Sequence, residues 1–240
     1  MRLAGFLETS LCDWEGKVSS VVFTQGCNFS CPYCHNPGLV PAAGPEAATD
    51  AEEIGGRLRA IRGWIDGVVV TGGEPTLQGG LDRWLGGLKR AGHRVKLDTN
   101  GSRPRILERL LDAGLVDAVA MDVKSAPTAE RYREACGREV DFGAVRASAE
   151  MLREAGVEVE FRTTAVPGLA DGEDIRAIAE WLGASARYII QQFRPGGCLD
   201  GRFDRVSPFP DEQLSKMRAI ASDLVAECRV RGEKLSGGRE

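Results

Sequence analysis

The chain has 240 residues, of which 42% are hydrophobic and 28% are charged, and its formal net charge is −4. This composition is ordinary for a globular protein with one core, and the mildly acidic balance gives no support for the clustered basic surface of a nucleic-acid-binding protein. We find neither a secretory leader nor a run of about 18 apolar residues, so we expect a cytoplasmic protein without a membrane-spanning helix.

Strand-like and helix-like segments alternate along the chain. Apolar, often β-branched segments predict strands at residues 18–24, 67–71, 94–98, 118–122, 158–166 and 187–193. Helices are predicted at residues 51–62, 81–91, 105–113, 142–155, 171–182 and 211 to about 229. Strands that are each followed by a helix predict an α/β fold, an open (β/α)6 parallel sheet that forms a partial TIM barrel. The carboxyl ends of its strands would lie on one rim.

A single domain is predicted over residues 1–240. It consists of an N-terminal extension at 1–17, the core at 18–195, and a C-terminal loop, helix and tail at 196–240. The Pro- and Ala-rich stretch at 41–50 predicts an exposed, lid-like connection, and the polar end of the chain predicts a frayed tail. His93 follows a predicted helix end and is expected at the surface.

Three cysteines, Cys27, Cys31 and Cys34, lie within eight residues directly after the first predicted strand. Thiolates at this C-x3-C-x2-C spacing can bind three corners of a four-iron cluster and leave the fourth iron open for chemistry, whereas electron-carrying clusters normally use four cysteines. Structural zinc is the alternative, with His35 as a fourth ligand. It is disfavoured because His35 directly follows Cys34 and the sequence has no second cysteine pair.

The remaining cysteines, Cys12, Cys136, Cys198 and Cys228, are widely separated. Their separation and the odd total of seven disfavour disulfides, so we expect free thiols in a reducing compartment. Cys198 lies in a glycine-containing loop after the last predicted strand of the core. It is the one of the four for which the sequence leaves a role open.

The segment Gly72-Gly73-Glu74-Pro75 follows the second predicted strand. Two glycines at a strand end allow backbone carbonyls to approach a ligand closely, because no Cβ intervenes. The alternative is an ordinary connection, since Gly-Gly and Pro are common at turns.

Two further strand ends carry acidic residues. Asp98 and Thr99 end the third predicted strand; Met121 and Asp122 end the fourth, and Lys124 follows. Carboxylates, a hydroxyl and an amine that meet on one rim can bind a hard cation together with a substrate carboxylate. The alternative is that each Asp only caps the segment that follows it.

The last two predicted strands carry Arg162, Gln191 and Gln192. Arg162 either faces the inside of the barrel, where it can pair with a carboxylate, or forms a salt bridge on the outer face; the alternation of the strand does not fix which. Gln191 and Gln192 are adjacent, so one of the two side chains should face inward.

The cysteine run, with the aromatic Tyr33 before Cys34, resembles the cluster loop of radical S-adenosylmethionine (SAM) enzymes. Residues 11–37 are more narrowly similar to the glycyl-radical-enzyme activases, and most of all to those of anaerobic ribonucleoside-triphosphate reductase. The likeness extends in pieces from about Leu3 to about Pro195. It implies a 4Fe-4S cluster on Cys27, Cys31 and Cys34, with SAM bound beside it.

The resemblance also implies roles for the strand ends. The cofactor-binding residues that it implies are Tyr33, Gly72, Gly73, Glu74, Asp98, Thr99, Lys124 and Arg162. The glycine segment would hold the amino group of SAM, and Lys124 would contact SAM. A monovalent cation would be cradled by Asp98, Thr99, Asp122 and the carbonyl of Met121. Some activases use a histidine near the last strand of the core, and this chain has none there.

The activity that the resemblance implies is reductive cleavage of SAM to methionine and a 5′-deoxyadenosyl radical, which removes hydrogen from a glycine of the anaerobic ribonucleotide reductase. A reduced flavodoxin or ferredoxin would donate the electron. The alternatives are an activase of another glycyl radical enzyme, or a radical SAM enzyme acting on a small molecule, as a 7-carboxy-7-deazaguanine synthase does. A structural iron–sulfur or zinc protein is the alternative outside enzymes.

Overall fold

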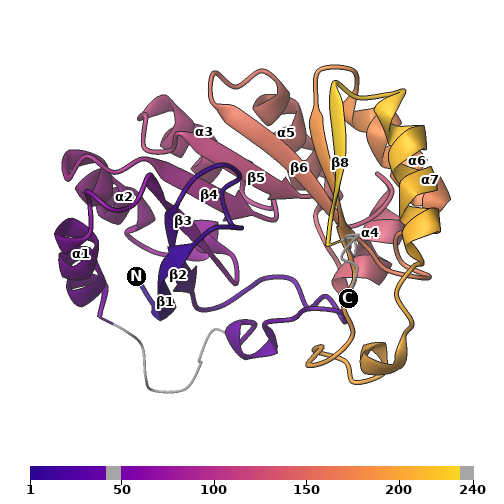
Figure 1. Ribbon diagram of the computed structural model, residues 1–240, viewed down its shortest axis with the longest axis horizontal. Helices are drawn as coiled ribbons and strands as arrows, with labels where there is room; N and C mark the ends of the chain where they lie inside the picture. Colours follow the sequence, from indigo (N-terminus) through magenta and orange to yellow (C-terminus); the bar gives the residue numbers. More distant parts are fainter. Residues whose placement is uncertain (42–49, 233–240) are drawn as a thin grey trace, which may run out of the picture. The chain divides into compact units, whose positions relative to one another are not determined.

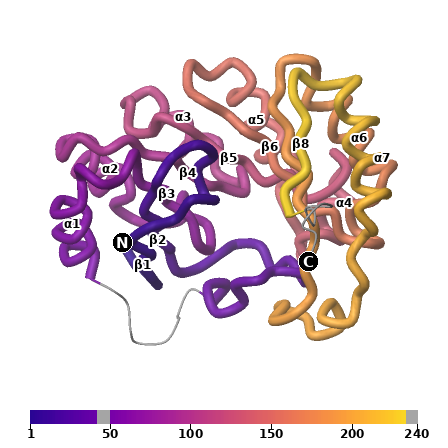
Figure 2. Tube along the Cα trace, viewed as in Figure 1, coloured from indigo at the N-terminus to yellow at the C-terminus, as the bar shows by residue number. Residues whose placement is uncertain are grey.

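A computed structural model describes residues 1–41 and 50–232, which form two compact units. The first unit contains residues 1–30, 36–121 and 143–159, and the second contains residues 31–35, 122–142 and 160 onward. Figure 2 follows the course of the chain. Most of the predicted lid-like connection and the predicted frayed tail lie outside the described residues.

The first unit contains most of the sheet. Its strands are β1 (Leu3–Ser10), β2 (Ser19–Thr24), β3 (Gly67–Gly72), β4 (Val95–Thr99) and β5 (Ala118–Asp122), whose last residue belongs to the second unit. They lie in chain order; β1 is antiparallel to β2, and the others are parallel (Figure 1). Its helices are α1 (Ala51–Ala60), α2 (Leu81–Arg90), α3 (Pro104–Asp112) and α5 (Phe142–Arg153), with 3-10 turns η1 (Pro37–Leu39) and η2 (Pro75–Leu77).

The second unit contains β6 (Glu158–Ala165), which begins in the first unit, and β7 (Arg187–Gln192) and β8 (Glu227–Arg231), all parallel. Its helices are α4 (Ala129–Cys136), α6 (Gly172–Leu182) and α7 (Asp211–Ser222), with a 3-10 turn η3 (Phe203–Arg205). Figure 1 shows α6 and α7 side by side next to β7 and β8.

Local sequence explains these elements. The β-branched run of β3 is fully buried from Gly67 to Val70, as expected for a central parallel strand. Helix α6 begins with a capping box, in which Asp171 and Asp174 accept hydrogen bonds from backbone N–H groups at each other's positions. Trp14, which is 1% exposed, packs against strand residues of one face of the first unit and closes its core there.

All six predicted strands are present within two residues of their expected ends. The predicted extension at 1–17 contains a strand, β1, which pairs with β2. The predicted last helix is wrong in its second half, because α7 ends at Ser222 and β8 follows. The five residues of β8 gain backbone partners along the edge of β7, and this long-range pairing overrides the local helical pattern. Helix α4 was not predicted; Thr128 caps it and Gly137, at φ 66°, ends it.

His93 is also a correction, since it is 4% exposed rather than at the surface. Its backbone N–H caps the end of α2 by donating to the carbonyl of Leu88 at 3.0 Å. Among the described residues, none of the helices combines the length and the apolar character that crossing a bilayer would require.

Candidate functional site at the carboxyl ends of the strands

The loop that follows β2 is held in place by backbone hydrogen bonds around its first cysteine. The N–H of Gly26 donates to the carbonyl of Leu39 at 2.8 Å, and that of Cys27 donates to the carbonyl of Val40 at 3.0 Å. The carbonyl of Gly26 accepts from the N–H of Glu74 at 2.8 Å. The loop is therefore fixed at the carboxyl end of β3, the parallel neighbour of β2.

The sulfur of Cys27 has two N–H groups beside it. The backbone N–H of Phe29 lies 3.4 Å from the Sγ atom, and the Nδ2 of Asn100 lies 3.9 Å from it. Asn100 also donates to the Oδ1 of Asn28 at 3.0 Å, and Asn28 donates to the hydroxyl of Ser102 at 2.8 Å. Cys27 is thus bracketed by donors from its own loop and from the end of β4.

The predicted glycine pair is needed for this close packing. Gly72 has φ 119°, and a Cβ there would lie 2.3 Å from the backbone nitrogen of Thr24. A Cβ on Gly73 would lie 2.1 Å from the carbonyl oxygen of Gly26. Any side chain at Gly73 would therefore displace the loop next to Cys27, which explains why this strand end carries two glycines.

Glu74 is fully buried, and both of its carboxylate oxygens accept hydrogen bonds. Oε1 accepts from the backbone N–H and the hydroxyl of Thr76, at 3.0 and 2.5 Å, and from the hydroxyl of Thr99 at 2.8 Å. Oε2 accepts from the backbone N–H of Asn100 at 2.7 Å. Burial raises the pKa of this carboxyl, while the four donors oppose that rise. Glu74 therefore ties the end of β3 to the end of β4.

Asp98 and Met121 lie in the first unit and are both buried. The side chain of Met121 packs beside Gly101, where a Cβ would lie 2.3 Å from its terminal methyl group. The Oδ1 of Asp98 is 4.0 Å from the Nζ of Lys96, which is 2% exposed and also donates to the carbonyl of Asp13 at 2.7 Å. Asp98 thus faces a cation that the chain itself supplies.

The other two cysteines of the motif belong to the second unit. The N–H of Cys34 donates to the carbonyl of Cys31 at 3.0 Å and closes a turn between them. A segment from the C-terminal part of the chain braces this turn. The N–H groups of Leu199 and Asp200 donate to the carbonyls of Cys34 and Pro32 at 3.1 and 2.9 Å.

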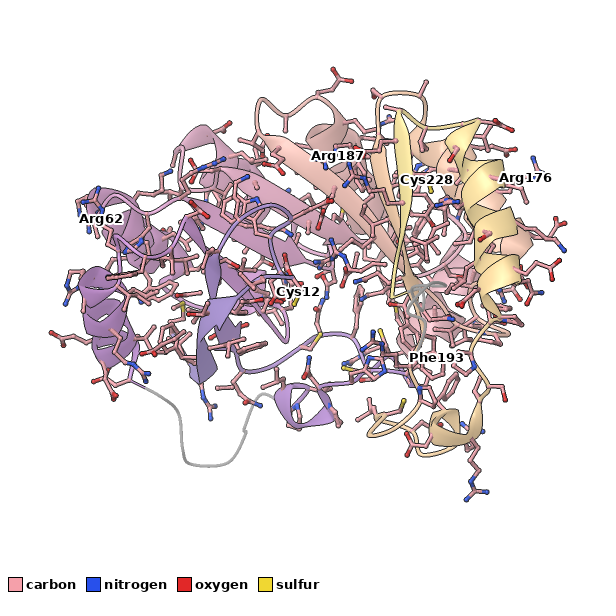
Figure 3. All side chains as sticks on the ribbon, viewed as in Figure 1. Cys12, Arg62, Arg176, Arg187, Phe193 and Cys228 are labelled. Atoms are coloured by element: carbon pink, nitrogen blue, oxygen red, sulfur yellow. The ribbon has the colours of Figure 1, made fainter. Side chains whose placement is uncertain are left out.

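His35 contacts the backbone of Arg194 and the ring of Phe193. Its Nε2 lies 2.5 Å from the carbonyl oxygen of Arg194, which can only accept, so this nitrogen carries the proton. The ring stacks on Phe193, labelled in Figure 3, at 5.9 Å between centroids.

Cys198 is ordered by its neighbours and is only 8% exposed. Its N–H donates to the Oδ1 of Asp204 at 2.9 Å, at the start of the turn that contains η3. Burial, followed by the hydrogen bond with Asp204, raises the pKa of its thiol. Cys198 is therefore a thiol with a raised pKa, fixed by Asp204, in the loop whose Leu199 donates a hydrogen bond to the carbonyl of Cys34.

A residue that the sequence analysis did not single out lies beside Cys31. Cys136, fully buried at the end of α4, forms a hydrogen bond that lowers the pKa of the Cys31 thiol to about 7, and the charge of Lys124 acts in the same direction against burial. Tyr33 is 5% exposed; burial and the neighbouring thiol of Cys31 raise its pKa. The Tyr33 hydroxyl has no hydrogen-bond partner among the described residues.

Asp122 is paired on both carboxylate oxygens within the second unit. Its Oδ2 lies 2.9 Å from the Nζ of Lys124, and its Oδ1 lies 3.0 Å from the Nε of Arg162. Burial alone would raise the pKa of Asp122, but the two cations hold it at about 2. Arg162, 9% exposed, therefore faces Asp122 and does not form the outer-face salt bridge that the sequence left open.

The register of β6 and β7 settles which glutamine shares a face with Arg162. Gln191 is paired with Thr164, two residues after Arg162, so Gln191 lies on the Arg162 face. Gln192 lies on the opposite face, and its Nε2 donates to the carbonyl of Phe209 at 2.6 Å.

The cysteine loop fits an iron–sulfur cluster, because cluster ligands must be thiolates and this loop stabilises them. Cys27 has N–H groups directed at its sulfur, and Cys31 has a lowered pKa. The predicted monovalent cation fits less well. Asp98 already faces Lys96, and Asp122 is occupied by two side-chain cations. The Oδ1 of Asp98 lies beyond hydrogen-bond distance of the Nζ of Lys96, so the cation site stays a prediction.

Sequence reasoning missed Asn28, Asn100, Lys96 and Cys136. The first three lie beside motif residues, and Asn100 directly follows Asp98 and Thr99 at a strand end, so the rule that selected those two could have included it. Cys136 gave no local signal, because only the folded chain brings α4 to Cys31.

Sequence comparisons identify the family to which this chain is related. Residues 21–182 match the model of the radical SAM superfamily. The chain is 34% identical over 239 residues, covering 95% of both proteins, to MJ1227 of Methanocaldococcus jannaschii, whose name provisionally assigns it as a glycyl-radical enzyme activating enzyme. It is 27% identical over 232 residues to the pyruvate formate-lyase 1-activating enzyme of Escherichia coli K12, covering 92% of this chain and 84% of that protein.

Solved structures share the fold. SuiB of Streptococcus suis bound to S-adenosylmethionine superposes with a TM-score of 0.67 at 14% identity, over 87% of this chain. The chain spans about half the length of SuiB, 48%. TYW1 with a lysine-pyruvate adduct superposes with a TM-score of 0.62 at 14% identity, covering 85% of this chain and 73% of TYW1. The predicted open α/β fold is thereby confirmed.

Proposed function

Because the chain belongs to the radical SAM superfamily, and within it to the glycyl-radical enzyme activating enzymes, we propose that it installs a glycyl radical on an anaerobic ribonucleoside-triphosphate reductase. Members of this superfamily use a 4Fe-4S cluster and SAM, so the chain is an oxidoreductase-type enzyme with those cofactors. The ligands that we assign to the cluster are Cys27, Cys31 and Cys34.

One observation carries the assignment of the site. The loop of Cys27 is locked onto the carboxyl end of β3 by the hydrogen bond between Gly26 and Glu74, and Gly73 is the residue that makes this approach possible. Cys27, the proposed cluster ligand, therefore lies next to the backbone that in this proposal would hold the amino group of SAM. This arrangement suits a cluster that binds a substrate at its open iron better than one that only carries electrons.

The chain's own residues would bind and orient SAM around the cluster, which supplies the electron for cleavage when it is reduced. Lys124, which is partly buried, and Arg162, which is buried, are cations that can accept the carboxylate of SAM in place of Asp122. Tyr33, whose hydroxyl lacks a partner among the described residues, can donate to the ligand. The burial of these groups would keep competing hydrogen donors away from the radical.

The radical step balances without a further oxidant. One electron from a reduced flavodoxin or ferredoxin cleaves the bond between sulfur and the 5′ carbon of SAM, giving methionine and a 5′-deoxyadenosyl radical. That radical takes one hydrogen atom from a glycine Cα of the partner protein. The products are 5′-deoxyadenosine and the stored glycyl radical.

A second partner is favoured by a specific observation. The pyruvate formate-lyase 1-activating enzyme of Escherichia coli matches 92% of this chain. A pyruvate formate-lyase-type enzyme is therefore the second candidate substrate. The alternative of a small-molecule substrate predicts SAM cleavage without a radical on either protein.

The experiment has two stages. The protein is reconstituted anaerobically, reduced, and given SAM; we expect 5′-deoxyadenosine with about four irons per chain, and neither in Cys31→Ala. Each candidate partner is then added, and the glycyl radical is measured by electron paramagnetic resonance. A radical on the ribonucleotide reductase alone supports the proposal, and one on the formate-lyase alone corrects the partner. Cleavage with no protein radical would refute the activase assignment for these partners.

A further inference from the structure

The side chain of Asn100 occupies a junction in the first unit that none of the assigned roles explains. Its backbone N–H donates to Glu74 at 2.7 Å, and its Oδ1 accepts from the backbone N–H of Ser102 at 3.0 Å. Its Nδ2 donates to Asn28 at 3.0 Å and lies 3.9 Å from the sulfur of Cys27. Asn100 is 5% exposed, so these contacts are shielded from water.

These contacts fix which end of the amide faces Cys27. The N–H of Ser102 donates to the Oδ1 of Asn100, which fixes that oxygen on the side of Ser102. The amide of Asn28 is oriented in turn, because its Nδ2 donates to the hydroxyl of Ser102 and its Oδ1 faces Asn100. If the amide of Asn100 were flipped, its oxygen would face the oxygen of Asn28, and its NH2 group would face the N–H of Ser102. The N–H groups of Asn100 are therefore held toward the sulfur.

We propose that Asn100 is a positioning residue that sets the orientation of Cys27 and raises the reduction potential of the cluster bound there. This inference rests on the proposed function only in requiring that Cys27 is a cluster ligand. A reduced cluster carries one more negative charge, and hydrogen bonds to its sulfurs stabilise that charge. An N–H group held beside Cys27 in a buried site favours the reduced form that SAM cleavage needs.

Glu74 gives this junction its rigidity. The carboxylate binds the backbone N–H of Asn100 and the hydroxyl of Thr99, so it fixes the residue after β4 relative to the end of β3. Glu74 is itself bound through its N–H to Gly26, next to Cys27. The Gly-Gly-Glu motif thus connects to the cluster loop twice, once through Gly26 and once through Asn100.

The test replaces the donor while keeping the acceptor. Asn100→Asp retains an oxygen for the N–H of Ser102 but turns an acceptor and a negative charge toward Cys27. Asn100→Leu removes the donor without adding charge. Ser102→Ala is the matched control, because it removes only the acceptor of Asn28 and leaves the N–H groups of Asn100 beside the sulfur.

The readout is the midpoint potential of the reconstituted cluster, from a redox titration followed by electron paramagnetic resonance without SAM or partner. Iron content and melting temperature are measured alongside. We expect a more negative potential in Asn100→Leu, a still more negative one in Asn100→Asp, and the wild-type value in Ser102→Ala. If Asn100→Asp melts like the wild type but takes up no iron, the role of Asn100 in orienting Cys27 is supported. The effect on the reduction potential is then judged from Asn100→Leu alone.

Wild-type iron content and potential in both Asn100 variants would overturn the inference, as would an equal shift in Ser102→Ala, which would indicate loosening of the loop alone. Failure of both Asn100 variants to fold would overturn it as well, since the residue would then be needed for stability and not for tuning. Because no partner protein is present, the result is independent of which glycyl radical enzyme is activated.

Discussion

Lys96 is a buried cation in the middle of β4, and its replacement by Met tests how the chain neutralises Asp98. Register places Lys96 beside Val69 and Ala118, on the face that Trp14 closes. Its Nζ is 4.0 Å from Asp98, which is 8% exposed. Lys96→Met keeps the length of the stem and most of its packing, so the change is mainly one of charge and hydrogen bonding.

We expect Lys96→Met to lower the free energy of unfolding by about 3 kcal/mol. Removal of one partner of a buried ion pair costs about 3–5 kcal/mol, and the long separation of this pair favours the lower end. The lost hydrogen bond to the carbonyl of Asp13 contributes about 1 kcal/mol of that cost. For a chain of this size, the melting temperature should fall by about 6–12 °C.

The assay is urea denaturation of the wild type, Lys96→Met, Asp98→Asn and the double variant. The double variant should recover part of the loss, because it leaves no unpaired charge, and the cycle should give a coupling energy of about 1–2 kcal/mol. Single effects that add to within about 0.5 kcal/mol would refute the pairing.

The same variants test whether Lys96 takes the place of a bound monovalent cation. The melting temperature of the wild type should be equal in KCl and choline chloride at matched ionic strength. Lys96→Met should melt at a higher temperature in KCl, because the vacated space beside Asp98 can admit the ion. A saturable effect of K⁺ on the wild type would contradict this reasoning and restore the predicted cation site.

Three further predictions concern the strand ends. Glu74→Gln should lower the free energy of unfolding by about 2–4 kcal/mol in urea denaturation, because the NH2 group of the amide would face donors that now bind a carboxylate oxygen, at about 1–3 kcal/mol per unsatisfied group. A change below about 1 kcal/mol would contradict the hydrogen bonds assigned to Glu74. Gly73→Ala should lose iron on reconstitution, since its Cβ would meet Gly26, whereas Gly79→Ala, with nothing within 4 Å, should keep it; equal iron content would refute the contact. For Asp122, the folded pKa of about 2 lies below the ordinary 3.8, so its stabilisation is present above 3.8 and lost as the pH falls through about 2. The stability difference between wild type and Asp122→Asn should shrink over that range, and a constant difference would argue against the pairing.

Most of the parallel core could be predicted from sequence because its signals are local. The run Val68 to Val70 between glycines is typical of a buried parallel strand, and it is fully buried. The strands at the two edges could not be predicted in this way. β8 has mixed polar residues, and only its pairing with β7 makes it a strand.

The site divides along the same line. Cysteine spacing and the Gly72-Gly73 pair are features of chemistry and backbone conformation, which sequence records directly. The sequence does not show which charged side chains will pair with one another in the folded chain. Arg162 could have faced either side of its strand, and its bond to Asp122 depends on register between distant segments. Cys136 illustrates the same point, since nothing in its own helix indicates that it lies beside Cys31.

The ion pairs of Asp122 in the second unit indicate how the proposed SAM site would accommodate two cations before a ligand binds. Lys124 and Arg162 would be costly to bury alone, and Asp122 offsets that cost while no ligand is bound. A ligand carboxylate can then replace Asp122 as the partner of one cation while the other keeps Asp122 charged. Exchange of one ion pair for another needs less energy than creation of a new buried pair, so ligand entry can be both selective and reversible. Glu74 does not take part in such an exchange, because its four donors all come from the fold and hold the strand ends in place whether or not SAM is bound.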